Sequence, residues 1–170
     1  MARWEAPEAF ALFVRDRHPE LLRFAYALTA DRYLAEDLVQ DALERTGIAW
    51  RRIHRHDDPE GYVRRIIVNR FLNRARSLRR ERLVEHPPER SVEPDSSAED
   101  AIWQALAGIP PAQRAAIVAR YYLDLTEAQA ALLLGCAVGT VKSNTSRALT
   151  NLRARLAPAD GTAAGKREPA

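Results

Sequence analysis

The stretch LTEAQAALLLGCAVGTVKSNTSRALTNLR, Leu125–Arg153, predicts two short helices joined by a tight turn. Thr126 and Gln129 have the spacing of a capping box, in which two side chains satisfy free backbone N–H groups at a helix start. Gly135 can adopt the left-handed conformation that ends a helix, and a new helical period begins at Thr140. This order predicts a helix-turn-helix, whose second helix can lie in the major groove of DNA. An ordinary helical hairpin with a polar outer face would show the same pattern.

The second predicted helix has one apolar and one polar face. Its apolar residues are Val141, Ala148, Leu149 and Leu152. The side chains left for solvent or a ligand are Lys142, Ser143, Asn144, Arg147 and Asn151. Basic and hydrogen-bonding groups in this arrangement are typical of a helix that binds nucleic acid.

The composition favours an all-helical protein. A chain of 170 residues allows one domain or two small ones, and few glycines with many Ala, Leu and Arg favour helices over sheets. The single cysteine, Cys136, excludes an internal disulfide and indicates a reducing compartment. No run is apolar enough for a signal peptide or a membrane span, so we expect a cytoplasmic protein without membrane insertion. The sequence contains no catalytic constellation, and we expect neither an enzyme nor a cofactor.

The net charge of +3 conceals blocks of unequal charge. Arg51–Arg82 has eleven arginines and four acidic residues, whereas Leu83–Asp100 has one arginine and six acidic residues. Ala101–Ala157 is basic again, with six basic and two acidic residues. Two basic blocks separated by an acidic spacer suggest two contacts with a polyanion, and a merely solvated surface is the alternative.

An acidic helix is expected in the N-terminal third of the chain. We expect one helix over Pro7–Arg17, a second opened by Pro19, and a third capped by Asp31 and ending near Trp50. The third has an acidic stripe with no basic partner four residues away, which consists of Asp37, Asp41 and Glu44, with Gln40 beside it. Like charges at this spacing repel one another. Water or a basic partner could cover such a stripe, and the residues alone do not distinguish the two.

The fourth predicted helix begins with Asp58 as its cap and Pro59 at its first position. Its candidate core residues are Tyr62, Val63, Ile66, Ile67, Phe71 and Leu78. Its polar residues fall on one nearly straight line and are Arg65, Asn69, Asn73 and Arg76. Asn and Arg side chains suit base edges, and the surrounding arginines can bind phosphates. In the preceding loop, His54 and His56 beside two aspartates could suggest a metal site, but one short loop does not fix a ligand geometry.

Two segments have little to bury. Residues 83–97 contain three prolines and read as a linker, and residues 158–170 read as a frayed tail. Between them, Ser96 caps an expected helix that ends before Pro110 and Pro111. We expect a further helix over Ala112–Tyr122, with an inward face formed by Ile117, Val118 and Tyr121.

Four motifs in this order resemble the extracytoplasmic-function (ECF, group IV) sigma factors of bacterial RNA polymerase, a group of the sigma-70 family. They are AEDLVQDAL (35–43), YVRRIIVNRFLNRAR (62–76), IPPAQRAAIVARYYLDLTEAQAALLLG (109–135) and GTVKSNTSRALTNLR (139–153). The resemblance implies an all-α protein with a region 2 helical bundle over residues 1–82 and a region 4 helix-turn-helix domain over residues 98–157. A flexible acidic linker over residues 83–97 would join them, and a disordered tail would follow. Such a factor binds core polymerase and directs it to the −35 and −10 elements of specific promoters.

The resemblance also assigns residues to three sets. The polymerase-binding set would dock on a basic-lined coiled coil of the largest polymerase subunit, and it consists of Asp37, Leu38, Gln40, Asp41 and Glu44. The set facing −10 DNA consists of Arg65, Asn69, Asn73 and Arg76. The set facing −35 DNA consists of Thr140, Lys142, Ser143, Asn144 and Arg147. The family often has an acid in place of Asn73 and an arginine in place of Asn144, so base preference at both positions is open. The loop Arg51–Asp58 would lie near the strand-opening site.

Further partners implied by the resemblance are promoter DNA, the flap of the second polymerase subunit and an anti-sigma factor. Two other functions explain part of the chain. A conventional helix-turn-helix regulator would bind a palindromic duplex site without polymerase. A protein adaptor would present the acidic and arginine-rich helices to other proteins and would not depend on Lys142 or Arg147 for DNA. The sequence does not identify the promoters or the inducing signal.

Overall fold

The computed structural model describes residues 7–53, 58–82 and 98–158. The elements are α1 (Glu8–Thr29), α2 (Arg32–Ile53), α3 (Pro59–Arg82), α4 (Ala98–Ala107), α5 (Pro111–Ile117), the π-helix η2 (Val118–Tyr122), α6 (Glu127–Leu134) and α7 (Val138–Leu156). No strand occurs in the described ranges, so the predicted all-α fold class is confirmed. The expected linker, the predicted helix cap Ser96 and the tail from residue 159 onward lie outside the described residues.

Helix α1 is continuous where the sequence predicted two helices. Pro19 lies inside it and leaves the carbonyl of Arg15 without its helical partner, at a cost of about 3 kcal/mol. Both residues are exposed, so water can bind that carbonyl. The apolar stripe continues in register from Phe10 to Leu21 and Phe24, which are all buried. Each such side chain contributes about 1.5–3 kcal/mol on burial, which offsets the proline and explains why the prediction of two helices was wrong.

Side-chain hydrogen bonds confirm two predicted helix starts. The carboxylate of Asp31 accepts a hydrogen bond from the backbone N–H of Leu34 at 3.1 Å, at the beginning of α2. The carboxylate of Asp58 accepts one from the N–H of Gly61 at 2.7 Å, at the beginning of α3. Each bond satisfies a donor that the first helical turn leaves free.

The segment before the helix-turn-helix is not the regular α-helix that the sequence predicted. Helix α5 continues into η2, and the N–H of Leu123 donates to the carbonyl of Val118 at 3.1 Å, the five-residue spacing of a π turn. Ile117 and Val118 are buried as predicted, but Tyr121 is 63% exposed. The inward placement of Tyr121 was wrong because the wider turn rotates this residue out of the 3.6-residue period.

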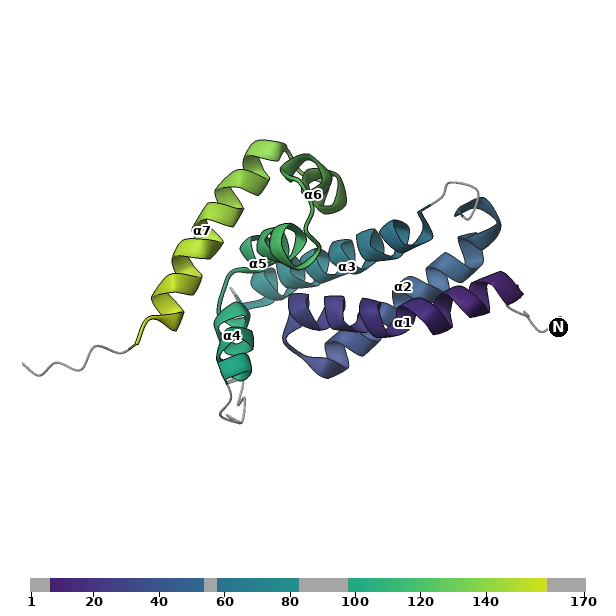
Figure 1. Ribbon diagram of the computed structural model, residues 1–170, viewed down its shortest axis with the longest axis horizontal. Coiled ribbons are helices and arrows are strands. Elements are labelled where there is room, and N and C mark those ends of the chain that lie inside the picture. Colours follow the sequence, from purple (N-terminus) through teal and green to yellow (C-terminus); the bar gives the residue numbers. More distant parts are fainter. Residues whose placement is uncertain (1–6, 54–57, 83–97, 159–170) are drawn as a thin grey trace, which may run out of the picture.

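One hydrophobic core runs through both halves of the chain. It contains Leu28 and Ile67 from the first three helices, together with Ile109, which lies between α4 and α5, and Ala130 and Val141 from α6 and α7. In Figure 1, α5 and α6 lie over α3, and α7 forms the outer side. Within the described ranges, no helix is both long and apolar enough to cross a membrane.

Candidate nucleic-acid interface

The polar line on α3 lies at the protein surface. All four of its residues are exposed, namely Arg65, Asn69, Asn73 and Arg76. The Arg76 guanidinium donates a hydrogen bond to the amide oxygen of Asn73 at 3.2 Å, which holds these two side chains together. Ile67, on the other face of the helix, is completely buried. The line extends for about three helical turns, or about 16 Å, and presents forked donors and acceptors over that length.

Both predicted signals that delimit α6 are confirmed. The Thr126 hydroxyl accepts a hydrogen bond from the N–H of Gln129 at 3.2 Å, and the Gln129 side chain accepts one from the N–H of Thr126 at 2.9 Å. Gly135 has a φ of 65°, which lies in the left-handed region that favours glycine, and it ends the helix. Because these signals fix both ends of α6, they set the sharp turn from which α7 emerges.

The outward face of α7 contains the predicted −35 set. Thr140, Lys142, Ser143 and Arg147 are exposed, and Asn144 is half-buried. The ammonium of Lys142 lies 3.6 Å from the carboxylate of Glu127, and the Ser143 hydroxyl donates to the carbonyl of Thr140 at 3.2 Å. An exposed ion pair contributes only about 0–1 kcal/mol, so Lys142 can exchange Glu127 for a phosphate at little cost.

Asn151 points inward, and its predicted place on the ligand face was wrong. Its amide donates a hydrogen bond to the side-chain oxygen of Gln113 at 2.7 Å. One turn later, the Arg155 guanidinium donates to the carbonyl of Gly108 at 2.7 Å. These bonds fix α7 against α5 and the preceding loop. Sequence periodicity could not reveal them, because it does not show which neighbouring element covers a polar position.

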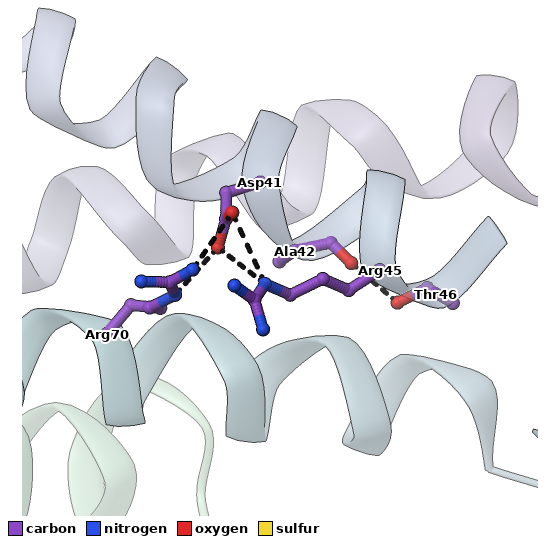
Figure 2. A network of polar contacts seen from close by, with 5 residues as sticks. All are labelled: Asp41, Ala42, Arg45, Thr46 and Arg70. Atoms are coloured by element: carbon purple, nitrogen blue, oxygen red, sulfur yellow. Dashed lines mark hydrogen bonds and ion pairs between the residues drawn. The ribbon is translucent and has the colours of Figure 1, made fainter. Parts of the chain in front are cut away.

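The acidic stripe on α2 is partly neutralised inside the protein. Figure 2 shows the Asp41 carboxylate between Arg45, at 3.1 Å, and Arg70 of α3, at 2.8 Å. The expectation that the stripe had no basic partner was wrong, because Arg45 stands four residues after Asp41 and the fold brings Arg70 to it. Asp37 and Glu44 are exposed, so they retain the negative charge that the helix presents to solvent.

Two exposed apolar residues flank the acidic stripe. Tyr33 is 81% exposed and Ile48 is 83% exposed. They lie four residues before Asp37 and four residues after Glu44, on the same helical face. Sequence reasoning missed both, although apolar residues outside the buried stripe were the available signal. Leu38, which the sequence placed in the polymerase-binding set, is 7% exposed and packs in the core.

A cleft of about 680 Å³ lies between the C-terminal half of α3 and the turn leading into α7. Its lining includes Arg76 of the −10 set together with Thr140 and Asn144 of the −35 set. Cys136 also lines the cleft, and burial raises the pKa of its thiol. The fold therefore brings members of the two predicted DNA-binding sets to one place.

The histidine-containing loop is outside the described part of the chain, with His54, His56 and Asp57 all in residues 54–57. Among the described residues, no three side chains of His, Cys, Asp or Glu form a group that could hold a metal ion.

Comparison with known proteins finds family models for both halves. The model of Sigma-70 region 2 matches residues 13–81, and that of Sigma-70, region 4 matches residues 99–152. The RNA polymerase sigma-E factor of Streptomyces coelicolor is 35% identical over 160 residues, which cover 89% of this chain and 88% of that protein. The ECF RNA polymerase sigma factor SigM of Mycobacterium tuberculosis H37Rv is 34% identical over 155 residues, covering 88% and 76%.

One chain of a solved structure has a similar fold over most of this chain. That structure is the complex of the sigma factor RpoE with the anti-sigma factor NepR from Bartonella quintana. The TM-score is 0.69 at 27% sequence identity, and the match covers 88% of this chain and 98% of that chain.

Proposed function

This chain belongs to the ECF sigma factors of the sigma-70 family, and on that basis we propose which of its surfaces bind core polymerase, the −10 element and the −35 element. As an alternative sigma factor, it binds core RNA polymerase, directs the enzyme to promoters and initiates transcription. One observation carries the proposed division: the acidic, −10 and −35 sets occupy three separate helices, α2, α3 and α7. We assign polymerase binding and −10 recognition to residues 1–82, and −35 recognition to residues 98–157.

The exposed face of α2 docks on the basic coiled coil of the largest polymerase subunit. Asp37 and Glu44 supply its charge, and Tyr33 and Ile48 supply exposed apolar area at either end. In protein interfaces, a few apolar or aromatic anchors carry most of the binding free energy, while charges guide association and orientation. Asp41, already paired within the protein, acts mainly by holding α2 against α3.

The line of Asn and Arg side chains on α3 reads the −10 element. Asn69 and Asn73 offer both donors and acceptors to base edges, and Arg65 and Arg76 neutralise phosphates. Separated strands expose base edges and faces that a duplex hides, so an exposed helical line of this length suits the strand that opens at the start site.

The outward face of α7 reads the −35 duplex from the major groove. Lys142 and Arg147 contact phosphates, which makes affinity depend on salt. Ser143 and Asn144 are short polar side chains on the first turns of the helix, where a helix-turn-helix approaches base edges. Thr140, at the start of the helix, adds a hydroxyl for a backbone phosphate.

Other partners and the location follow from the family. Region 4 contacts the flap of the second polymerase subunit. The likeness to a solved complex of a sigma factor with the anti-sigma factor NepR supports an anti-sigma partner for this chain. We expect such a partner to cover these same surfaces. The factor acts in the cytoplasm at the nucleoid, and nucleotide addition belongs to the polymerase, so the chain contributes no catalytic group and needs no cofactor.

The proposal is tested by transcription in vitro with purified core RNA polymerase and a library of upstream DNA from the source genome. New start sites that depend on the protein and share two short elements at fixed spacing are expected. Lys142→Ala with Arg147→Ala should abolish these starts while leaving co-purification with core polymerase unchanged. Duplex binding without polymerase and without new starts would favour a conventional helix-turn-helix regulator.

A further inference from the structure

Two arginines beside the −10 line belong to none of the three predicted sets. Arg45 of α2 and Arg70 of α3 both reach the Asp41 carboxylate, as Figure 2 shows. The Nε and Nη2 atoms of Arg70 lie 2.8 and 3.1 Å from the two carboxylate oxygens. Arg45 uses its Nε alone, at 3.1 Å from Oδ2 and 3.3 Å from Oδ1. Two positive charges therefore share one negative charge, and the group keeps a net charge of +1.

This group presents unused hydrogen-bond donors at the protein surface. A guanidinium can donate from each of its nitrogens, and within the described residues Arg45 and Arg70 bond only Asp41. Both terminal nitrogens of Arg45 and the Nη1 atom of Arg70 are therefore available. The two side chains are 53% and 42% exposed, so a ligand can reach these nitrogens. Asp41 already holds both guanidinium groups in place, which lowers the entropic cost of binding a further anion.

The position of the group next to the −10 line indicates which anion it binds. Arg70 follows Asn69 directly and precedes Asn73 by three positions, and residues three apart are neighbours on a helix surface. A strand whose bases contact these amides must run its sugar–phosphate backbone along one side of the line. Arg70 stands on the side of α3 that faces α2, where Asp41 and Arg45 lie. Arginine forks match the oxygens of a phosphate, which accepts several N–H donors at once.

We propose that Arg45 and Arg70 form a phosphate site for the backbone of the open −10 strand, and that Asp41 positions both. The inference rests on the proposed function and deepens it, because it depends on the assignment of Asn69 and Asn73 to the −10 element. A carboxylate of polymerase would also fit two arginines, but the docking partner assigned to α2 is basic, and a group of positive charge repels it. A phosphate held between α2 and α3 fixes the register of the strand, so the same bases always meet the two amides.

Neutral phosphates in a DNA probe test the site directly. The probes are the two separated strands of a promoter found in the start-site assay, labelled for fluorescence anisotropy, with one phosphate at a time replaced by an uncharged methylphosphonate. Holoenzyme with the unaltered factor should lose about tenfold in affinity at one such position. Holoenzyme with Arg70→Gln should bind the unmodified strand about tenfold more weakly and lose nothing further at that position. Its slope of log affinity against log salt concentration should fall by about 0.7. Arg45→Gln should be insensitive at the same position.

The matched control is Arg32→Gln, which removes the same charge from the same helix. Arg32 also forms an ion pair with an acid four residues away, at 3.0 Å from Glu36, and it lies about 20 Å along α2 from Arg45. This variant should keep the affinity and the methylphosphonate response of the unaltered factor.

Three results would overturn the phosphate site. In the first, no single methylphosphonate weakens binding by the unaltered factor, a result that needs no variant. In the second, Arg70→Gln keeps the full methylphosphonate loss. In the third, Arg45→Gln and Arg70→Gln weaken co-purification with core polymerase at unchanged Tm, which would assign the arginines to a carboxylate of that enzyme. Base preference that depends on Asn69 would leave the proposed −10 role intact in each case, whereas no binding of either strand would overturn that role as well.

Discussion

Replacing Arg114 with methionine should destabilise the whole protein and not only its C-terminal half. Methionine fills much of the buried space but removes the three donors to the carbonyls of Leu28, Ala107 and Ile109. A hydrogen bond from a charged donor contributes about 1.5–3 kcal/mol, and a buried carbonyl left without a partner adds a desolvation cost. Because such contributions are not additive within one network, we expect the free energy of unfolding to fall by about 3–5 kcal/mol.

Thermal unfolding followed by circular dichroism measures this effect. In a chain of this size, 1 kcal/mol corresponds to about 2–4 °C, so the Tm of Arg114→Met should fall by about 10 °C. Arg114→Lys keeps the positive charge but not the planar guanidinium, so its Tm should lie between those of the unaltered protein and Arg114→Met. A loss below about 1 kcal/mol would refute the reasoning, because it would mean that water or other donors satisfy the three carbonyls. A transition in which only α4–α7 melt earlier would contradict the coupling of the two regions.

Two substitutions on α2 should separate polymerase docking from folding. Asp37→Lys is expected to abolish co-purification with core polymerase while the helix content stays unchanged. Asp41→Asn removes the ion pairs of Figure 2 and should lower the free energy of unfolding by about 1 kcal/mol. Equal loss of binding in both variants would contradict this division. The affinity of the holoenzyme for a −35 duplex can be measured by fluorescence anisotropy at several salt concentrations. Arg147→Ala should reduce the slope of log affinity against log salt concentration by about one. An unchanged slope would place Arg147 away from the phosphates. Thr126→Ala removes the capping box and should lower the free energy of unfolding in urea by about 1 kcal/mol, while a neutral effect would mean that water replaces the hydroxyl. Burial raises the pKa of the Cys136 thiol, and iodoacetamide alkylates only the thiolate. The rate of alkylation of Cys136 should therefore increase at a higher pH than the rate for a cysteine-containing peptide. An increase at a lower pH than the peptide's would contradict this prediction.

Local signals in the sequence were sufficient to predict helix starts and ends where a residue interacts with its own helix. Asp31, Asp58 and Thr126 each bond a backbone group three residues away, and Gly135 ends α6 through its own backbone conformation. Such interactions depend on spacing alone, so the sequence predicts them correctly. The polar line of α3 and most of the polar face of α7 are also at the surface as expected, because helical period determines which side of a helix the apolar stripe leaves exposed. Asn144, which is half-buried, and Asn151, which bonds Gln113, are the exceptions on α7.

Interactions between distant segments were not predictable in this way. Arg70 pairs with Asp41 across 29 positions, and Arg114 caps Leu28 across 86 positions. Neither separation has a periodic signature, and nothing in the sequence distinguishes a buried arginine from an exposed one. Tyr121 was misplaced for a different reason, because a π turn changes the period on which the prediction depends. The continuous core between the two regions escaped prediction because an apolar stripe does not specify its partner.

A requirement for two promoter elements would make selective DNA binding by this factor depend on core polymerase. Eleven arginines lie between Arg51 and Arg82, and genomic DNA offers a great excess of non-specific sites to such a basic surface. Core polymerase, docked on the exposed α2 face, would present α3 and α7 to the two elements of one promoter together. Once one element is bound, the second contact forms at high effective concentration, so selectivity arises from the pair of elements rather than from either one.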